Sequence, residues 1–310
     1  MMPFLSQKGI ALVLVLWVIV LLTVIAGAMS MTQRNGVYMT SNIRAEREGR
    51  ALVDAGINFM MLQLKVKPGN EQNALWPMDG RLRPWEFAGR TIWIGALPES
   101  GRIDLNRAPE ELLLGLLVSA GLSESQAASI KDAIVDWRDR DQDPKPQGAE
   151  DSDYISAGRP LGARDELFMS VEELQQVLGV TPDLYNKIKP ALTVHSRQRK
   201  VNPFYAPPEV LKALPGMTEE MVNEFSNMRT QPGSEAGFQG TVPSGQFVTK
   251  SKGSAFRVMA EVELPDGTVV QGEAIVNSRR KTPHGYLVSV RHYGPIWNLG
   301  RAGETGQLMN

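Results

Sequence analysis

An uncharged apolar run near the start of the chain constrains its fold more than any other feature. Residues 10–29 (IALVLVLWVIVLLTVIAGAM) contain no charged side chain. A helix of this length reaches about 30 Å, the thickness of a bilayer's hydrocarbon core, because each residue adds about 1.5 Å. The sequence contains no second run of this kind. We therefore expect one membrane-spanning helix and a soluble part that lies on one side of the membrane.

Composition limits the classes of function. The chain has 310 residues with a net charge of −1, which argues against wholesale electrostatic binding to nucleic acid. It has no cysteine, which excludes disulfides, thiol catalysis and cysteine metal sites. Its three histidines are far apart, and the sequence contains no G-x-S-x-G, H-E-x-x-H or phosphate-binding glycine loop. We therefore expect a protein that is not an enzyme.

The apolar run has three interpretations. A secretory signal peptide would be cleaved after Ala28, although its apolar stretch is usually only about 7–15 residues long. A plain anchor would place the bulk of the chain in the cytoplasm, because most of the flanking arginines follow the run. The third interpretation rests on Lys8-Gly9, which stand directly before Ile10. This junction resembles the type IV pilin-like signal, which prepilin peptidase cuts between the glycine and the next residue, here Gly9 and Ile10.

The residues beyond the apolar run favour the pilin-like interpretation. There is no proline between Phe4 and Lys67, and apolar residues such as Leu52, Phe59 and Leu62 continue at helical spacing. The sequence thus predicts one helix over residues 10–66, about 85 Å long and ended by Pro68-Gly69. An ordinary anchor does not need such an extension.

Leu14 indicates where such a subunit would sit in a filament. Most pilin-like subunits carry a glutamate at the fifth position after the cleavage site, and this chain has Leu14 there. A carboxylate buried in lipid is costly unless it is paired, so its absence fits a subunit that has no neighbour ahead of it. We therefore expect this subunit at the tip of a filament.

Strand patterns lie at both ends of the soluble part. Residues 85–96 (WEFAGRTIWIGA) are rich in aromatic and β-branched residues, with a predicted turn at Gly89-Arg90. Residues 255–264 alternate between apolar and polar and turn at Pro265-Asp266-Gly267 into residues 268–276. This pattern predicts an antiparallel hairpin with one solvent-exposed face, and residues 286–291 add a further strand.

The middle of the chain has a helical pattern. Residues 108–113 (APEELL) and 206–211 (APPEVL) are similar, and each places proline at the start of a helix. Helix–turn–helix units are predicted around residues 120–123, 178–181 and 214–218. Acidic residues follow each turn and would repel phosphate, so we expect no nucleic-acid partner.

Several segments carry a resemblance to one family. They are Lys8-Gly9-Ile10 with Leu14, residues 101–108 (GRIDLNRA), 136–139 (DWRD), 148–154 (GAEDSDY) and 170–174 (SVEEL). In this order they resemble the K subunit of type II secretion, general secretion pathway protein K, over nearly the whole chain. Residues 202–206 (NPFYA) depart from the family pattern. The resemblance implies an α+β fold, in which a pilin-like N-terminal helix packs on an antiparallel sheet and a large α-helical domain is inserted.

The resemblance also implies a domain order and a function. The expected parts are a leader (1–9), an N-terminal helix (10–67, membrane part 10–29), a pilin-like α/β part (68–106), an inserted helical domain with an acidic loop (107–200), and a second helical unit with the rest of the sheet (201–310). The implied protein is a minor pseudopilin of the inner membrane, single-pass, with its C-terminal part in the periplasm. It would cap the tip of the type II secretion pseudopilus, initiate the filament and support export across the outer membrane.

The implied partners are minor pseudopilins of the I and J type, the major pseudopilin, prepilin peptidase, and the secretin or an exported substrate. One alternative is a signal-anchored or signal-cleaved periplasmic protein that binds calcium or another protein. A more remote alternative is an envelope hydrolase.

An acidic block between Asp132 and Asp153 suggests a metal site. It holds eight acidic and three basic residues, and hard oxygen ligands at this density suit Ca²⁺. The block lacks the glycine and distal glutamate of an EF-hand, and a solvated loop balanced by its own arginines is the alternative. Because members of the resembled family hold calcium in such a loop, the resemblance favours calcium. The candidate ligands are Asp139, Asp141, Asp143, Glu150, Asp151 and Asp153, whereas Asp136 is expected on the preceding helix, with Trp137 packing inward.

Overall fold

The computed structural model describes residues 8–64, 76–228, 243, 245–278, 286–296 and 300–301. Residues 1–7 of the predicted leader and the predicted helix stop at Pro68-Gly69 lie outside the described residues.

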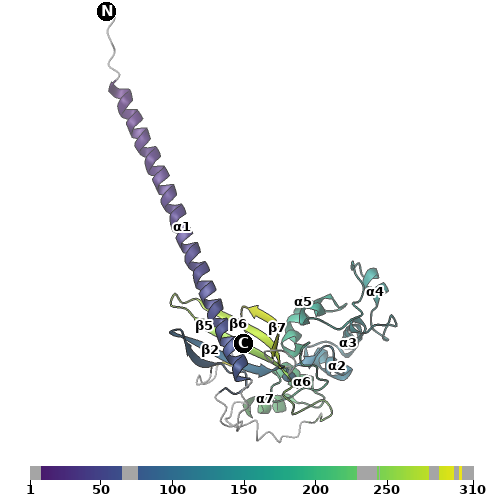
Figure 1. Ribbon diagram of the computed structural model, residues 1–310. Coiled ribbons are helices and arrows are strands. Elements are labelled where there is room, and N and C mark those ends of the chain that lie inside the picture. Colours follow the sequence, from purple (N-terminus) through teal and green to yellow (C-terminus); the bar gives the residue numbers. More distant parts are fainter. Residues whose placement is uncertain are drawn as a thin grey trace, which may run out of the picture.

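A single long helix leads from the N-terminal end to the sheet, as the sequence predicts (Figure 1). Helix α1 (Lys8–Gln63) is unbroken over 56 residues and ends slightly before the predicted end. Its segment Leu12–Met29 is long and apolar enough to cross a membrane, and no other helix among the described residues meets both conditions. Gly56 allows α1 to approach the sheet closely, since a Cβ there would lie 2.7 Å from Cγ2 of Ile94.

The sheet has five antiparallel strands in the order β1-β2-β5-β6-β7. Their bounds are β1 (Arg83–Phe87), β2 (Arg90–Pro98), β5 (Ala255–Glu263), β6 (Val269–Ser278) and β7 (Tyr286–Tyr293). The three predicted strand regions are thus confirmed. The first turn lies at Ala88 and Gly89, both with positive φ, rather than at Gly89-Arg90, because Arg90 already pairs with Phe87.

Both faces of the sheet are covered at its central strand β5, so the prediction of a solvent-exposed face is wrong for β5. One face packs on α1, where Val53, Ile57 and Met60 are buried against the sheet. On the opposite face, Met259 is fully buried in a cluster with Leu82, Leu97 and Tyr205. Segments distant from the hairpin in the sequence therefore cover the side that alternation alone assigned to solvent.

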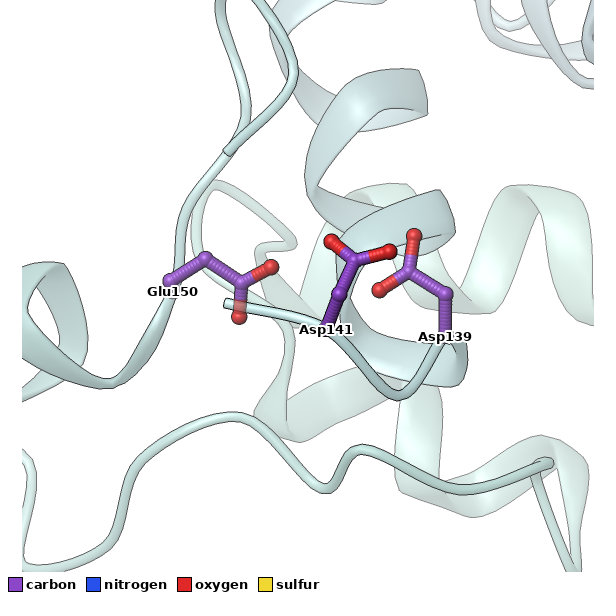
Figure 2. Close-up of side chains that lie close together, drawn as sticks. All are labelled: Asp139, Asp141 and Glu150. Carbon is purple, nitrogen blue, oxygen red and sulfur yellow. The ribbon is translucent and has the colours of Figure 1, made fainter. Parts of the chain in front are cut away.

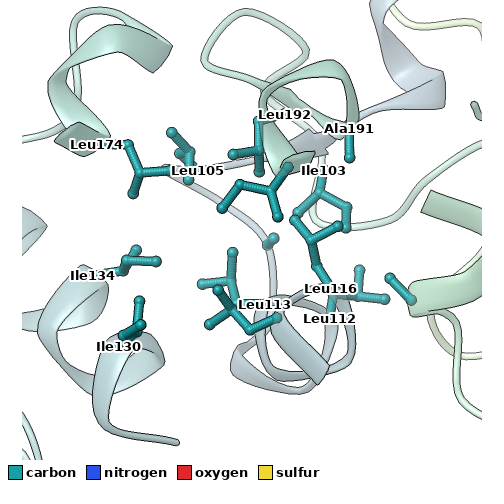
Figure 3. Packing of buried hydrophobic residues seen from close by; sticks show 14 of the residues in the cluster. Ile103, Leu105, Leu112, Leu113, Leu116, Ile130, Ile134, Leu174, Ala191 and Leu192 are labelled. Carbon is teal, nitrogen blue, oxygen red and sulfur yellow. The ribbon is translucent and has the colours of Figure 1, made fainter. Parts of the chain in front are cut away.

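A helical part with its own core lies between β2 and β5, beside the sheet (Figure 1). Its elements are η2 (Glu99–Gly101), β3 (Ile103–Asp104), α2 (Glu110–Ser119), α3 (Glu124–Arg138), α4 (Asp151–Ser156), η3 (Val171–Gln176), α5 (Pro182–Ile188), η4 (Lys189–Ala191), β4 (Leu192–Thr193), α6 (Pro208–Ala213) and α7 (Glu219–Met228). Figure 3 shows Leu113 of α2, Ile130 of α3 and Leu192 of β4 among the side chains that surround this core.

The predicted helix–turn–helix units are confirmed by their caps. Ser123 forms a capping box with Gln126 at the start of α3. The hydroxyl of Thr181 accepts the amide of Leu184, and the hydroxyl of Thr218 accepts the amide of Met221. Each side chain satisfies an amide that has no partner within the first turn of its helix.

The two similar proline-containing segments start helices that pack together. Helices α2 and α6 meet so closely that a Cβ at Gly115 would collide with the carbonyl oxygen of Ala213. The helical part also contains a two-stranded parallel sheet, in which β3 pairs with β4 and Asp104 lies opposite Thr193.

Candidate functional site

The loop between α3 and α4, residues 139–150, is held in place by two carboxylates of α3. Asp136 accepts hydrogen bonds from the amides of Lys145 (3.1 Å) and Ala149 (2.9 Å), and Asp132 accepts one from the amide of Gln147 (3.2 Å). Asp136 is on the helix and Trp137 is buried, as predicted. Backbone amides on helix carboxylates thus order this loop, and no ion pair between a loop carboxylate and Arg138 or Arg140 occurs among the described residues.

Three of the six predicted ligands come together at the end of α3. Oxygen atoms of Asp139, Asp141 and Glu150 all lie within 4.8 Å of one another. Figure 2 shows the three carboxylates gathered there, with Asp139 and Asp141 just after the helix and Glu150 on the returning chain. None of the three forms an ion pair with a described lysine, arginine or histidine. We call these residues the acidic cluster.

Buried oxygens of the acidic cluster lack hydrogen-bond partners. Glu150 is only 3% exposed, and neither of its carboxylate oxygens has a partner in the described structure. Oδ1 of Asp139 is in the same condition. Burial, together with the charges of neighbouring carboxylates including Asp136 and Asp139, raises the pKa of Glu150 to about 7. Unpaired buried carboxylates are costly, and an oxygen-binding divalent cation would satisfy them, so the residues present fit calcium.

The other three predicted ligands have different positions. The amide of Asp143 donates to Oδ1 of Asp141 (3.1 Å), while its own carboxylate lies outside the acidic cluster. Asp153 accepts a hydrogen bond of 3.0 Å from the amide of Glu150 and thereby caps α4. Asp151 lies in the first turn of α4 against Gly162. The structure therefore does not bring these three carboxylates into the acidic cluster.

Asp165 is a neighbouring acidic residue that the sequence analysis missed. Burial raises the pKa of both Asp139 and Glu150, and the negative charge of Asp165 adds to this rise; Oδ1 of Asp165 is itself buried without a partner. Its backbone has φ of 57°, a left-handed conformation that aspartate adopts more readily than most residues. Asp165 lies well beyond the acidic block in the sequence, so neither charge density nor spacing points to it.

The predicted processing and assembly residues lie at the free end of α1. Gly9 and Ile10 are in its first turn, and Leu14 follows one turn later. The Leu14 side chain is 61% exposed, within a band of exposed apolar side chains from Leu12 to Ile25. None of the described residues outside α1 covers this band, and such an apolar surface is stabilised by contact with lipid or other helices.

Comparison with known proteins agrees with the predicted resemblance. The family described as "Type II secretion system (T2SS), protein K" matches residues 96–197. A Pseudomonas aeruginosa protein named type II secretion system protein K is 25% identical over 296 residues, which cover 84% of this chain and 86% of that protein. An Escherichia coli K12 relative of the same type is 24% identical over 205 residues, so the match spans 61% of this chain and 63% of that protein's length. The resemblance predicted from the sequence is thus confirmed.

A solved structure confirms the predicted fold class. One chain of the crystal structure of the GspK-GspI-GspJ complex from the enterotoxigenic Escherichia coli type 2 secretion system superposes on this chain with a TM-score of 0.56. The two chains are 16% identical, and the superposition covers 85% of this chain and 99% of the other. The α+β architecture, with a long helix on an antiparallel sheet and a large helical part, is therefore shared.

Proposed function

We propose that this chain, a relative of type II secretion system protein K, works as a minor pseudopilin that caps the tip of a secretion pseudopilus. It acts by assembly rather than by catalysis. Helix α1 would span the inner membrane once and hold the sheet and the helical part in the periplasm. The observation that carries this proposal is the unbroken α1, whose exposed apolar half carries Leu14 instead of an acidic residue.

The exposed apolar band supports assembly through helix packing. Side chains such as Trp17 and Leu21 are 71% and 59% exposed, and neighbouring transmembrane helices bury such surfaces in a filament. A glutamate in this band would need a cationic partner on an adjacent subunit, whereas Leu14 needs only apolar contacts. The solved structure named above is a complex of GspK, GspI and GspJ, and we propose the I-type and J-type minor pseudopilins as partners of this chain.

The breadth of the soluble part supports the terminal position. The helical part extends sideways from the sheet, at the end of the molecule farthest from the start of α1 (Figure 1). Filament subunits that pack their long helices side by side leave little lateral room around each soluble domain. A subunit with this additional part would therefore end the filament, where it could meet the secretin or an exported substrate.

The mature N-terminus tests the pilin-like pathway. The full chain is expressed with and without prepilin peptidase, and the product is analysed by intact mass and terminal sequencing. A start at Ile10 that depends on the peptidase is expected. A start at Met29 would indicate signal-peptidase cleavage after Ala28 and loss of the membrane helix, and the pseudopilin proposal would then be abandoned in favour of a periplasmic binding protein.

Single cysteines test the proposed helix packing, since the chain has none of its own. Val24→Cys lies in the exposed apolar band of α1, and Glu166→Cys is a matched exposed position in the helical part. With cysteines introduced into the helices of I-type and J-type subunits, the Val24 variant should form disulfide-linked heterodimers in membranes and the Glu166 variant should not. Equal yields from both positions would contradict packing through α1.

We also propose that the acidic cluster binds calcium through Asp139, Asp141 and Glu150. Calorimetric titration of the full chain in detergent should show calcium binding, and Glu150→Gln should weaken it by at least about tenfold, because the most buried ligand loses its charge. Asp143→Asn is the matched control, since it removes one charge from the same loop outside the acidic cluster. Equal losses of calcium affinity in both variants would show that calcium binding depends only on the overall charge of the loop.

A further inference from the structure

A cavity of about 680 Å³ lies at the start of α2, and none of the residues that line it belongs to the acidic cluster, although Arg138 directly precedes Asp139 in the chain. Four arginines line it, together with Glu110 and Glu111. Arg107 precedes α2, Arg138 ends α3, and Arg197 and Arg199 follow β4. The guanidinium groups therefore come from three segments that are distant in sequence, and we call this feature the arginine cavity.

The parallel pair β3 and β4 places these segments together. Both strands run in the same direction, so the loops that follow Asp104 and Thr193 leave at the same end. The Asp104 carboxylate is 1% exposed and holds both loops, since Oδ1 accepts the amide of Asn106 (2.9 Å) and Oδ2 accepts the amide of Arg197 (2.7 Å). Oδ2 also accepts a hydrogen bond of 2.9 Å from the hydroxyl of Ser196.

The backbone of Arg197 is held in an uncommon conformation by these contacts. Its φ is 55°, which is unfavourable for a residue with a long side chain. The hydrogen bond from its amide to Asp104 compensates for this and fixes where the arginine leaves the loop. The cavity wall is thus built in advance of any ligand.

The arginine cavity has an excess of positive charge. The guanidinium of Arg138 already has hydrogen-bond partners within the chain, because it donates to the carbonyl oxygens of Leu105 and Ala108. The side chains of Arg107, Arg197 and Arg199 are exposed and form no hydrogen bond or ion pair with the part of the chain that the structure describes. They remain available to a ligand.

The acidic residues of the arginine cavity do not cancel this charge. Glu110 is already paired with Lys131 at 2.9 Å and with Lys145 at 3.1 Å. Only Glu111, which is exposed, has no cationic partner among the described residues. Three free guanidinium groups therefore face one free carboxylate.

We propose that the arginine cavity binds an acidic peptide segment of a partner protein through its carboxylates. Guanidinium groups pair with carboxylates in bidentate hydrogen bonds, and the lining arginines come from three segments of the chain rather than from one loop. This distribution suits carboxylates spaced along an extended chain. Glu111, which also lines the cavity, disfavours a compact phosphate group of higher charge density. The site is independent of filament assembly through α1, so either can fail without the other.

A fluorescent hexaglutamate peptide tests this site. The full chain in detergent micelles should bind the labelled peptide in an anisotropy titration, with an affinity that falls as salt is added. Hexaglutamine should not bind. The double variant Arg107→Gln/Arg199→Gln should weaken hexaglutamate binding by about tenfold or more, because two charge-assisted pairs are lost. Both arginines are exposed, so we expect the variant to fold, and circular dichroism checks this.

A charge-matched variant makes the test specific. Arg140→Gln/Arg159→Gln removes the same charge from exposed positions outside the arginine cavity and should change the affinity less than about twofold. An equal loss in both double variants, or equal binding of hexaglutamine, would overturn the proposal. Displacement of the peptide by tripolyphosphate at a lower concentration than by free hexaglutamate would instead identify a phosphate site and would also overturn it.

Discussion

Arg257 on β5 donates a hydrogen bond of 2.9 Å from Nε to Oε1 of Glu99, although 158 residues separate the two. Glu99 is fully buried in η2, where it also pairs with Arg102 at 3.3 Å and accepts the hydroxyl of Thr193. Arg257 in turn pairs with Glu273 of β6 at 2.5 Å. This buried network joins the sheet to the base of the helical part and fixes the position of one relative to the other.

Replacing Glu99 should therefore destabilise the junction. Glu99→Gln keeps the side-chain size but leaves the charges of Arg257 and Arg102 partly uncompensated in a buried place, and we expect a loss of about 3–5 kcal/mol in the free energy of unfolding. Urea denaturation followed by tryptophan fluorescence measures it. Glu48→Gln, which breaks the exposed pair with Arg90, should cost less than about 1 kcal/mol. Equal effects of the two substitutions would contradict a buried network.

The same carboxylate makes the stability of the chain depend on acid pH. Burial alone would raise the pKa of Glu99, but the charges of Arg257 and Arg102 outweigh it and lower the pKa from 4.5 to about 2. A carboxyl group whose pKa is lower in the folded state stabilises the fold above its unfolded pKa and loses this contribution as pH falls toward the folded pKa. The unfolding free energy should thus fall between pH 4.5 and about pH 2. This fall should be smaller in Glu99→Gln than in the wild type, and identical slopes would exclude Glu99 as its source.

Replacing Gly115 with alanine should not give the increase in stability that this substitution usually gives inside a helix. Alanine in place of glycine normally stabilises a helix interior by about 1 kcal/mol, but a Cβ at Gly115 would collide with the carbonyl oxygen of Ala213. We expect Gly115→Ala to lower the unfolding free energy by about 1–3 kcal/mol by separating α2 from α6. Val118→Ala, on the exposed side of the same helix, should stay within about 0.5 kcal/mol of the wild type. A stabilised Gly115→Ala protein would contradict close packing of these helices.

Replacing Glu150 in the acidic cluster should change the melting temperature in opposite directions, relative to the wild type, without calcium and with it. Without calcium, Glu150→Gln should raise the melting temperature at pH 8, because it removes a buried charge that has no partner. With calcium in excess, the wild type should gain stability by mass action while Glu150→Gln gains little. Thermal unfolding with calcium and with a chelator compares the four cases. A wild-type melting temperature that does not change when calcium is added would contradict metal binding at the acidic cluster.

Local sequence signals predicted the separate elements of this fold well. Alternation located the hairpin of β5 and β6, and Ser123 and Thr181 marked the helix starts that their side chains cap. Sequence alone did not show what covers the second face of the sheet, because Tyr205 reaches Met259 only through the tertiary fold. It also missed β3 and β4, which have two residues each and are too short to produce a periodic pattern.

The candidate sites, like the fold, were predicted from the sequence only where their residues lie within one segment. Charge density pointed to the acidic block, but only the fold distinguishes Glu150, which is buried without a partner, from Asp153, which caps a helix. Asp165 and the arginine cavity had no local signal, because each combines residues from segments that are distant in the sequence, and for the cavity the pairing of β3 with β4 brings them together. Spacing in the sequence can identify ligands within one loop and cannot identify those assembled from several loops.

The register of β2 against β5 has a consequence for how the chain folds. Pro98 lies opposite Phe256, so the helical part occupies the place of the loop in an antiparallel hairpin. Closing an unstructured loop of about 150 residues costs roughly 4–5 kcal/mol of chain entropy. A helical part that folds first brings Glu99 and Ala255 together and removes most of this cost. We therefore expect the helical part to act as the folding nucleus and the central strands of the sheet to pair afterwards.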